Sequence, residues 1–465
     1  MGFFKAYDMR GTFAADFDLG LVRRIGRALP KVVTPGGERR RWLVGRDCRA
    51  TSPDVARELK SGLAESGAEV TDLGLCTTPM VYFFTAEGGF DASVMVTASH
   101  NPPTDNGLKV SSSGARPVGY ADGLNKVEEM VAGEAQDVQP SQAGSVAPSC
   151  DESALARYIA WQREATPDDA FAGLRYAVDC SCGMSSIFAR ELFPGAMLLN
   201  DRLDGRFPAH SPNPLKADAR EQVAKAVREN GLDCGVIFDG DADRAMFVDE
   251  RGEFVQPDYL VPVVARATSA AKKARCPGGV PTKIIHDIRT SRGAIEALKE
   301  DGFEPVMVPV GHVFAKRALR EVGALCGGEL AGHYYFSEFH GCDSGVLAAR
   351  RILAEIARAK RGGKTFSEMM APISGRYANS GEVNFRVEDK TAAVERVLEA
   401  AAANLPPEVS RSRMDGIRVE YAQGWFNLRA SNTEPYLRLV AECDTKERLA
   451  EWMRILTDAI EGKTA

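Results

Sequence analysis

A serine and a histidine follow a strand-like run in the first quarter of the chain. Residues 92–96 are mostly apolar, and Thr97-Ala98-Ser99-His100-Asn101-Pro102-Pro103 comes directly after them. Proline disfavours helical backbone in the residue before it, so we expect a strand that ends in a loop carrying Ser99 and His100. Ligands of open α/β sheets gather at the carboxyl ends of strands. With Lys109 nearby in the sequence, Ser99 is a candidate nucleophile or phosphoryl carrier, and a polar turn that satisfies its own backbone is the alternative.

Three carboxylates alternate after a second apolar run. Residues 232–238 lead into Asp239-Gly240-Asp241-Ala242-Asp243-Arg244. Carboxylates this close repel one another unless a hard cation lies among them, and their oxygens suit Mg²⁺. A solvated acidic turn is the alternative, but a buried strand seldom leads into one. The sequence therefore predicts a magnesium site at Asp239, Asp241 and Asp243.

A loop in the third quarter of the chain has groups that could recognise a sugar. Glu329 and His333 lie in Gly328-Glu329-Leu330-Ala331-Gly332-His333. A carboxylate can accept hydrogen bonds from two neighbouring sugar hydroxyls, which favours hexose recognition. A salt bridge and a core histidine are the alternatives.

A loop near the C-terminal end has the groups that hold a phosphate dianion. Arg429 offers a planar fork of donors, and the next polar residues, Ser431, Asn432 and Thr433, add neutral donors beside backbone amides. Apolar, strand-like segments lie on both sides of this loop. A capped surface turn is the alternative to phosphate binding.

Alternating strand-like and helix-like segments must position these loops, which indicates α/β domains with mixed, largely parallel sheets. At 465 residues the chain is too long for one core. We expect four domains: 1–150 with the serine loop, 151–255 with the metal loop, 256–370 with the sugar loop, and 371–465, an α+β domain, with the phosphate loop. A Gly-, Ser-, Gln- and Pro-rich segment at 133–150 is typical of a linker.

Three charged residues follow the first of these strands, at residues 42–45 of the chain. They are Arg46, Asp47 and Arg49, and they are placed to support the serine loop. An exposed salt bridge is an equally good interpretation of them.

Composition and charge exclude several classes of protein. A formal net charge of −6 argues against non-specific nucleic-acid binding. No apolar run approaches the roughly 18 residues of a membrane span, and the N-terminal residues lack a signal peptide's apolar region. The 10 cysteines form no paired zinc signature, which is typical of a reducing cytoplasm. We therefore expect a cytoplasmic enzyme that binds neither nucleic acid nor membrane.

The serine and acidic loops, at 97–102 and 239–244, resemble the phosphoserine and metal loops of the α-D-phosphohexomutase superfamily. The opening Phe4-Lys5-Ala6-Tyr7-Asp8-Met9-Arg10-Gly11 resembles the phosphomannomutase/phosphoglucomutase branch. The matching motifs run in the family's order from residue 3 to the C-terminal end. The resemblance implies three similar α/β domains and a C-terminal α+β domain around a central cleft.

The resemblance also implies an activity: interconversion of hexose 1-phosphate and hexose 6-phosphate through a phosphoserine and a hexose 1,6-bisphosphate. Ser99 would be the phosphoserine, with one Mg²⁺ per active site held by Ser99, Asp239, Asp241 and Asp243. Arg244 and the Mg²⁺ would offset charge on the moving phosphoryl group. Proton transfer has three candidates by resemblance, Lys109, His100 and Arg10.

Further residues match substrate-binding positions of the family. Tyr7 lies in the opening motif, His312 follows Val310-Gly311, and Glu329, His333, Arg429, Ser431, Asn432 and Thr433 lie in the two loops described above. Arg289 falls where relatives often carry lysine. Ala331 replaces a serine that relatives often carry, which removes a contact to sugar or phosphate.

The opening motif favours this branch over the phosphoglucosamine mutases, and Gly114-Ala115-Arg116-Pro117 resembles phosphomannomutases. Mannose phosphates are therefore the leading substrates, with phosphoglucomutase or dual-specificity activity as the alternative. A phosphoglucosamine mutase and a Mg²⁺-dependent sugar phosphatase are less favoured. A non-catalytic sugar-phosphate regulator is disfavoured because the serine, the lysine and the three aspartates are all present. We expect a monomer or a homodimer with small hexose phosphates as its partners.

Overall fold

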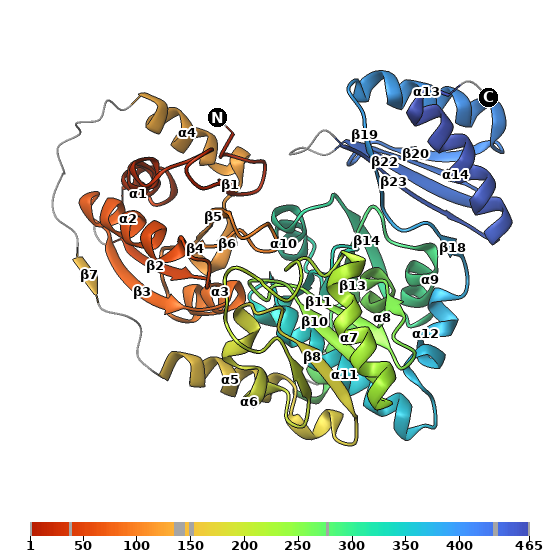
Figure 1. Ribbon diagram of the computed structural model, residues 1–465, viewed down its shortest axis with the longest axis horizontal. Helices are drawn as coiled ribbons and strands as arrows, with labels where there is room; N and C mark the ends of the chain where they lie inside the picture. The colour runs from red at the N-terminus through yellow and green to blue at the C-terminus, as the bar shows by residue number, and fades with distance from the viewer. Residues whose placement is uncertain are drawn as a thin grey trace.

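The computed structural model describes residues 2–36, 40–133, 145–147, 153–275, 279–430 and 436–463. Their strands form four sheets that follow one another along the chain (Figure 1). The first three sheets mix parallel and antiparallel pairs, and the fourth is antiparallel throughout. The predicted class of three mixed α/β domains and a C-terminal α+β domain is confirmed. The boundaries near 150, 255 and 370 and the central cleft stay predictions.

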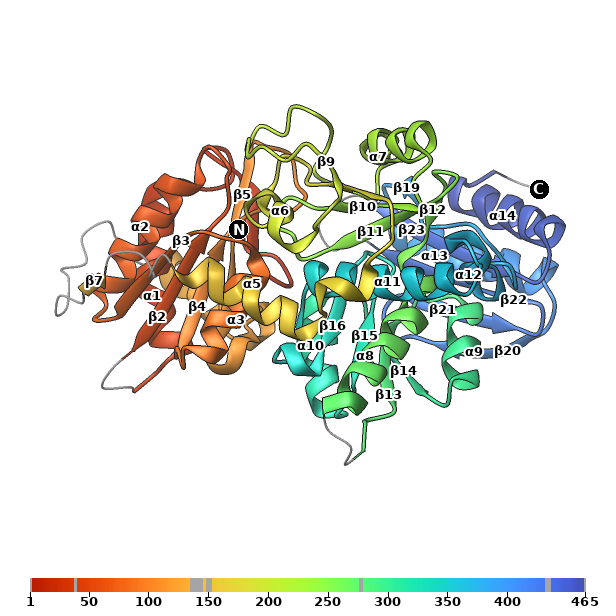
Figure 2. The same cartoon turned by 90° about the horizontal axis from the view of Figure 1, so that it is seen from below.

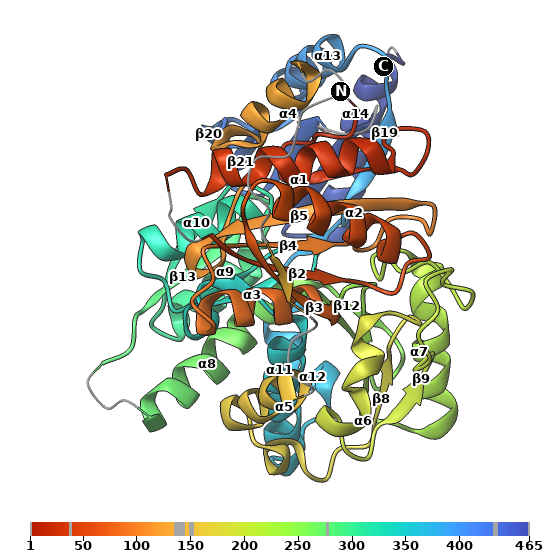
Figure 3. The same ribbon diagram turned by 90° about the vertical axis from the view of Figure 1, so that its left-hand side faces the viewer.

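The first sheet is buried on both faces. Its strand order is β1-β5-β4-β2-β3-β7, with β6 beside β5. Alternate residues of β2 enter different cores: Trp42 and Val44 pack with α1, α2 and α4, and Leu43 packs with α3, so helices cover both faces (Figure 3). A sheet covered in this way explains the continuous apolar run of β4. The elements are β1 (Met9–Thr12), α1 (Leu19–Val33), β2 (Arg41–Arg46), α2 (Ser52–Glu65), β3 (Glu69–Leu75), α3 (Thr78–Glu87), β4 (Ala92–Val96), β5 (Asp105–Ser112), β6 (Arg116–Pro117), α4 (Leu124–Gly133) and β7 (Ser145–Ala147).

The second and third sheets share one plan. In each, three strands run parallel and two more continue the sheet antiparallel, in the orders β12-β11-β10-β8-β9 and β14-β13-β15-β16-β17. The second has β8 (Tyr176–Asp179), α6 (Ala189–Leu192), β9 (Met197–Leu199), α7 (Ala217–Asn230), β10 (Cys234–Phe238), β11 (Ala245–Asp249) and β12 (Phe254–Val255), preceded by α5 (Ser153–Ala165). The third has α8 (Val261–Arg275), β13 (Lys283–Asp287), α9 (Arg292–Glu300), β14 (Glu304–Val308), α10 (His312–Glu321), β15 (Cys326–Gly328), β16 (Tyr334–Phe336), β17 (Cys342–Asp343), α11 (Gly345–Arg361) and α12 (Phe366–Ser374).

The fourth sheet has the order β18-β23-β22-β21-β20, with β19 beside β23. Helices α13 and α14 pack together against it and share its apolar core (Figure 1). Its elements are β18 (Ala378–Asn379), β19 (Val383–Arg386), α13 (Lys390–Asn404), β20 (Glu408–Ser412), β21 (Ile417–Tyr421), β22 (Gly424–Ala430), β23 (Tyr436–Cys443) and α14 (Lys446–Glu461).

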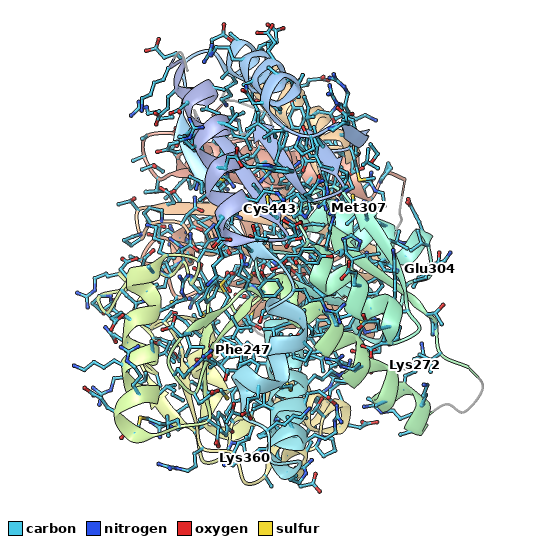
Figure 4. The ribbon with its side chains drawn as sticks, turned by 90° about the vertical axis from the view of Figure 1, so that its right-hand side faces the viewer. Phe247, Lys272, Glu304, Met307, Lys360 and Cys443 are labelled. Atoms are coloured by element: carbon cyan, nitrogen blue, oxygen red, sulfur yellow. The ribbon has the colours of Figure 1, made fainter. Side chains whose placement is uncertain are left out.

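Helix α11 joins the second and third domains. It lies beside α5 (Figure 2), and the buried guanidinium of Arg350 donates to the carbonyl oxygens of Leu192 and Thr166. At its far end the ammonium of Lys360 lies 2.7 Å from a carboxylate oxygen of Asp233, just before β10 (Figure 4). One apolar core runs through the first three domains, whereas the fourth has its own core. No helix in the described part of the chain is long and apolar enough to cross a membrane.

Candidate active site

Ser99 lies in the loop after β4, and its side chain reaches the acidic loop after β10. Ser99 is 1% exposed, and its Oγ donates to Oδ2 of Asp239 over 2.9 Å. Nδ1 of His100 lies 3.3 Å from the same Oγ. The backbone of Ser99 is left-handed, with φ of +53°, which residues other than glycine rarely adopt. The loop therefore presents its hydroxyl to a carboxylate of another domain.

The three aspartates of the acidic loop form one buried cluster. Each of Asp239, Asp241 and Asp243 offers a carboxylate oxygen within 4.8 Å of the others. Nζ of Lys109 donates to Oδ2 of Asp241 and of Asp243 over 2.6 Å each, and Oγ1 of Thr78 donates to Oδ2 of Asp241 over 2.5 Å. Oδ1 of Asp241 and Oδ1 of Asp243 have no hydrogen-bond partner among the described residues. Buried carboxylate oxygens left open in this way fit a hard divalent cation such as Mg²⁺.

The charges in this cluster shift one another's protonation. Burial and the neighbouring Asp243 and Asp241 carboxylates raise the pKa of Asp239. Burial opposes ionisation of Asp241, but the Lys109 ammonium and the hydrogen bonds from Lys109 and Thr78 together lower the pKa of Asp241. Burial also opposes ionisation of Lys109, but the Asp241 and Asp243 carboxylates together raise the pKa of Lys109. Lys109 therefore remains an ammonium ion between Asp241 and Asp243.

Two arginines and a neutral histidine complete this part of the site. The guanidinium of Arg10 donates to Oδ1 of Asn101 over 3.1 Å, and Nε of Arg244 lies 3.7 Å from carboxylate oxygens of both Asp239 and Asp243. Burial, followed by the charges of Arg244 and Arg10, lowers the pKa of His100 well below its usual value. His100 is therefore a neutral imidazole beside the serine hydroxyl.

The loop after β15 lies against the acidic loop, because Arg244 and His333 form an antiparallel bridge. Nδ1 of His333 donates to Oδ2 of the buried Asp343 over 2.8 Å. Nε2 is then the ring nitrogen that Asp343 does not bind. Oε1 of Glu329 accepts from the backbone N–H of Gly311 over 2.8 Å, and burial raises the pKa of this carboxyl.

Tyr7 and His312 meet at the junction of the first and third domains. The hydroxyl of Tyr7 donates to the carbonyl oxygen of Val310 over 3.1 Å, and its ring lies 6.1 Å from that of His312. Both ring nitrogens of His312 are buried and have no hydrogen-bond partner within the described ranges. A buried imidazole without partners is available to a ligand's hydroxyl groups.

Arginines of the third and fourth domains converge on one glutamate. Arg429 of β22 and Arg438 of β23 are directly opposite each other, and Arg289 approaches from the loop after β13. The carboxylate of Glu382 lies 2.8 Å from Arg289, 3.3 Å from Arg438 and 3.7 Å from Arg429. Like charges directly opposite in a sheet repel, so these arginines are arranged around an anion. Ser431, Asn432 and Thr433, which we predicted to add donors here, lie outside the described residues.

Comparison with known proteins identifies the family. The phosphoglucomutase/phosphomannomutase models match in four parts: alpha/beta/alpha domain I at residues 1–137, domain II at 157–252, domain III at 256–377, and the C-terminal domain at 382–459. The chain belongs to the phosphoglucomutase/phosphomannomutase family. The resemblance inferred from the serine, acidic and opening motifs is confirmed.

Similar members of this family come from several bacteria. The chain is 36% identical over 443 residues to the "Phosphohexose mutases" of Xanthomonas campestris pv. campestris (strain B100), covering 94% of each chain. It is 34% identical over 457 residues to a phosphomannomutase of Escherichia coli (strain K12), again covering 94% of each. The crystal structure of a phosphoglucomutase/phosphomannomutase family protein from Burkholderia thailandensis has a TM-score of 0.81 at 27% identity, covering 99% of this chain and 97% of that one.

The fold of this family member brings the predicted residues together in two groups. Ser99, His100, Lys109, Arg10, Arg244 and the three aspartates form the first group, and the Arg244–His333 bridge joins it to the sugar loop with Glu329, Tyr7 and His312. Arg289 and Arg429 form the second group around Glu382.

Sequence reasoning missed three polar side chains of the site. Thr78 contacts Asp241 from the first turn of α3, Asp343 orients His333, and Glu382 lies among the arginines. Two of the three lie far from their partners in the sequence, because 163 residues separate Thr78 from Asp241 and 93 separate Arg289 from Glu382. Asp343 lies 10 residues after His333, beyond the end of the sugar-loop motif. Thr78-Pro79 gives the signal of a helix start, which predicts the position of α3 but not its partner.

Proposed function

We propose that this chain interconverts hexose 1-phosphates and hexose 6-phosphates, with mannose phosphates favoured, through a phosphoserine at Ser99 and a hexose 1,6-bisphosphate. The observation that carries this proposal is the buried Ser99 hydroxyl, 2.9 Å from one carboxylate of a three-aspartate cluster. Once phosphorylated, a serine at that place can pass its phosphoryl group to a sugar and then accept another on its hydroxyl, because Lys109 and Arg244 lie at the same acidic cluster and offset the charge. The names of the relatives, phosphohexose mutases and phosphomannomutase, agree with this activity.

Asp239, Asp241 and Asp243, with an oxygen of the Ser99 side chain, would hold one Mg²⁺. The open Oδ1 atoms of Asp241 and Asp243 support this assignment. When bound, Mg²⁺ neutralises charge on the phosphoryl oxygens during transfer. Lys109 and Arg244 add positive charge at the same carboxylates and would offset the charge of a phosphoryl group on Ser99.

Proton transfer must accompany each transfer of the phosphoryl group. His100 is neutral and lies 3.3 Å from Ser99 Oγ, so it can accept the hydroxyl proton of the unphosphorylated serine. Lys109 and Arg10 are held charged by carboxylates and suit charge neutralisation better than proton acceptance. His333, with Nδ1 fixed by Asp343, has Nε2 left for a sugar hydroxyl.

The second group of residues would hold the phosphate that is not reacting. Arg289 and Arg429, with Ser431, Asn432 and Thr433 as further donors, can bind a dianion at either end of the sugar. Glu329, Tyr7 and His312 would bind sugar hydroxyls between the two phosphates. One site could then accept the bisphosphate in both orientations, as the return of a phosphoryl group to Ser99 requires.

The test is a coupled mutase assay with Mg²⁺ and a trace of glucose 1,6-bisphosphate, run with mannose 1-phosphate, glucose 1-phosphate and glucosamine 1-phosphate. We expect turnover of the mannose phosphate at constant organic phosphate. Ser99→Ala should lower kcat by roughly 10³-fold or more, because it removes the covalent route. Ser113→Ala, an exposed serine after β5, is the matched control and should keep full activity.

Release of inorganic phosphate would identify a hydrolase instead of a mutase. Turnover of glucosamine phosphate alone would show that the preference for mannose is wrong. Near-normal mutase activity of Ser99→Ala would refute the phosphoserine.

A further inference from the structure

The guanidinium of Arg49 lies beneath the serine loop and binds its backbone. Arg49 follows β2 and is 1% exposed. One terminal nitrogen donates to the carbonyl oxygens of Ser99 and Asn101 over 2.8 Å each. The other donates to the carbonyl oxygens of Pro102, over 2.5 Å, and Asp105, over 3.0 Å.

The remaining donor of the same side chain is also used. Nε of Arg49 donates to Oδ2 of Asp47 over 3.1 Å, so all five N–H groups of the guanidinium have acceptors. Asp47 is fixed in turn, because its Oδ1 accepts from the backbone N–H of Arg49 and from the hydroxyl of Ser52. A buried charge with every donor satisfied makes the loop rigid, whereas an ammonium with three donors could not bind all five acceptors.

A loop of the second domain covers the other side of Arg49. The ring centroid of Phe207 lies 5.1 Å from the guanidinium carbon. Gly205 of the same loop packs closely on the backbone of Cys48 and Arg49: an added Cβ would lie 2.2 Å from the carbonyl oxygen of Cys48. Phe207 is buried and its backbone is left-handed, with φ of +49°. A bulky residue keeps this conformation only where its surroundings fix it.

The same contacts reach the acidic loop. A Cβ added at Gly240 would lie 2.5 Å from the carbonyl oxygen of Ser99 and 3.5 Å from the ring of Phe207. The backbones of the serine and acidic loops therefore touch beside the Arg49–Phe207 pair. Arg49 donates to the carbonyl oxygen of Ser99, and Gly240 packs against the same oxygen, so both contacts fix the left-handed backbone of Ser99.

We propose that Arg49, held in place by Phe207, is the positioning residue that aligns the Ser99 hydroxyl with the acidic loop for phosphoryl transfer. This inference rests on the proposed function, because it concerns the rate at which Ser99 takes and gives a phosphoryl group. The Arg49 guanidinium donates to protein acceptors with all five of its N–H groups, so its loss should change the rate of transfer and leave sugar binding nearly as it was.

The experiment compares Arg49→Lys and Phe207→Leu with the wild-type chain. Single-turnover phosphorylation of Ser99 by glucose 1,6-bisphosphate is followed by intact-protein mass spectrometry, and steady-state assays give kcat and KM. Arg351→Lys is the matched control, since Arg351 is a buried arginine of α11 bonded to Thr268 and Glu338, away from the serine loop.

For Arg49→Lys we expect Ser99 phosphorylation and kcat to fall by about 10²-fold, the loss typical of a misplaced reacting group, with KM changed less than about threefold. Phe207→Leu should lower both rates by about threefold to thirtyfold, because it removes only the ring contact. Arg351→Lys should lose thermal stability but keep kcat. A loss of kcat in Arg351→Lys equal to that in Arg49→Lys would reduce Arg49 to a general structural role.

Wild-type rates of Ser99 phosphorylation in a folded Arg49→Lys would overturn the inference. If Arg49→Lys does not fold, Phe207→Leu decides in the same way: slower phosphorylation at unchanged KM supports the inference, and wild-type rates refute it. A wild-type chain that takes no phosphoryl group from glucose 1,6-bisphosphate overturns the proposed function instead, so the two failures are distinguishable.

Discussion

Replacing Lys109 by methionine tests whether one ammonium and one divalent cation neutralise the same carboxylates. Lys109 is 6% exposed and bonds two buried aspartates over 2.6 Å each. Removing one partner of a buried ion pair costs about 3–5 kcal/mol, because the other charge stays buried and uncompensated. At about 2–4 °C per kcal/mol for a domain of this size, Tm without metal should fall by roughly 6–20 °C.

Mg²⁺ should then stabilise Lys109→Met more than it stabilises the wild-type chain. In the wild type the metal must compete with the ammonium for Asp241 and Asp243, whereas in the variant the site has one more uncompensated negative charge. Saturation at 100 times Kd contributes about 2.7 kcal/mol, and a tenfold gain in affinity adds about 1.4 kcal/mol. Much of the lost Tm should therefore return in the variant.

The assay is thermal unfolding in EDTA and across a MgCl₂ titration. Lys60→Met is the matched control, because Lys60 pairs with the partly exposed Asp72 in the same domain, outside the active site. It should lose about 1 kcal/mol or less and respond to Mg²⁺ as the wild type does. Equal Mg²⁺ shifts in Lys109→Met and the wild type would refute the view that lysine and metal share the carboxylates.

Two buried groups outside the site predict opposite pH dependences. Burial raises the pKa of Asp258 to about 7, so the wild type loses stability as pH rises from about 4 to 7 and this buried carboxyl ionises. Asp258→Asn should therefore gain stability relative to the wild type over that range, by roughly 4 kcal/mol at most. Urea unfolding at pH 5 and pH 8 measures the difference. Burial lowers the pKa of His286 to about 4, so the wild type should lose up to roughly 3 kcal/mol relative to His286→Gln as pH falls from 6.5 to 4. A stability difference between either variant and the wild type that does not change with pH would contradict the assigned burial effect.

Strands that carry the site could be predicted because their signals are local. The run at 92–96 is β4 to the residue, since apolar residues end there and the Asn-Pro-Pro sequence excludes a helix. The run at 232–238 contains β10, which begins at Cys234. Helix α11 likewise has local end signals, because the Ser344 side chain accepts from the backbone N–H of Leu347 at its start and Gly362 follows its last residue. In the segment expected to be a linker, the described residues Ser145–Ala147 form β7 beside β3.

Partners across domains could not be predicted in the same way. The sequence allowed two interpretations of Arg49, support of the serine loop or an exposed salt bridge. The second is wrong, because Arg49 is buried and binds the backbone of that loop. Likewise, nothing near Glu382 in the sequence indicates that three arginines surround it. Periodicity reports which face of an element is buried, but the identity of a polar partner depends on how domains dock.

The polar groups of the site are satisfied across domain boundaries. Asp239 accepts from Ser99, while Asp241 accepts from Thr78 and Lys109, and all three of these donors belong to the first domain. Without the first domain, these carboxylates would lose Ser99, Thr78 and Lys109 as partners and would face water instead. Docking of the first domain takes the carboxylates out of water, and the hydroxyl donors and the ammonium that it brings offset this cost. The residues that perform the proposed chemistry therefore also form the polar contacts between the first two domains.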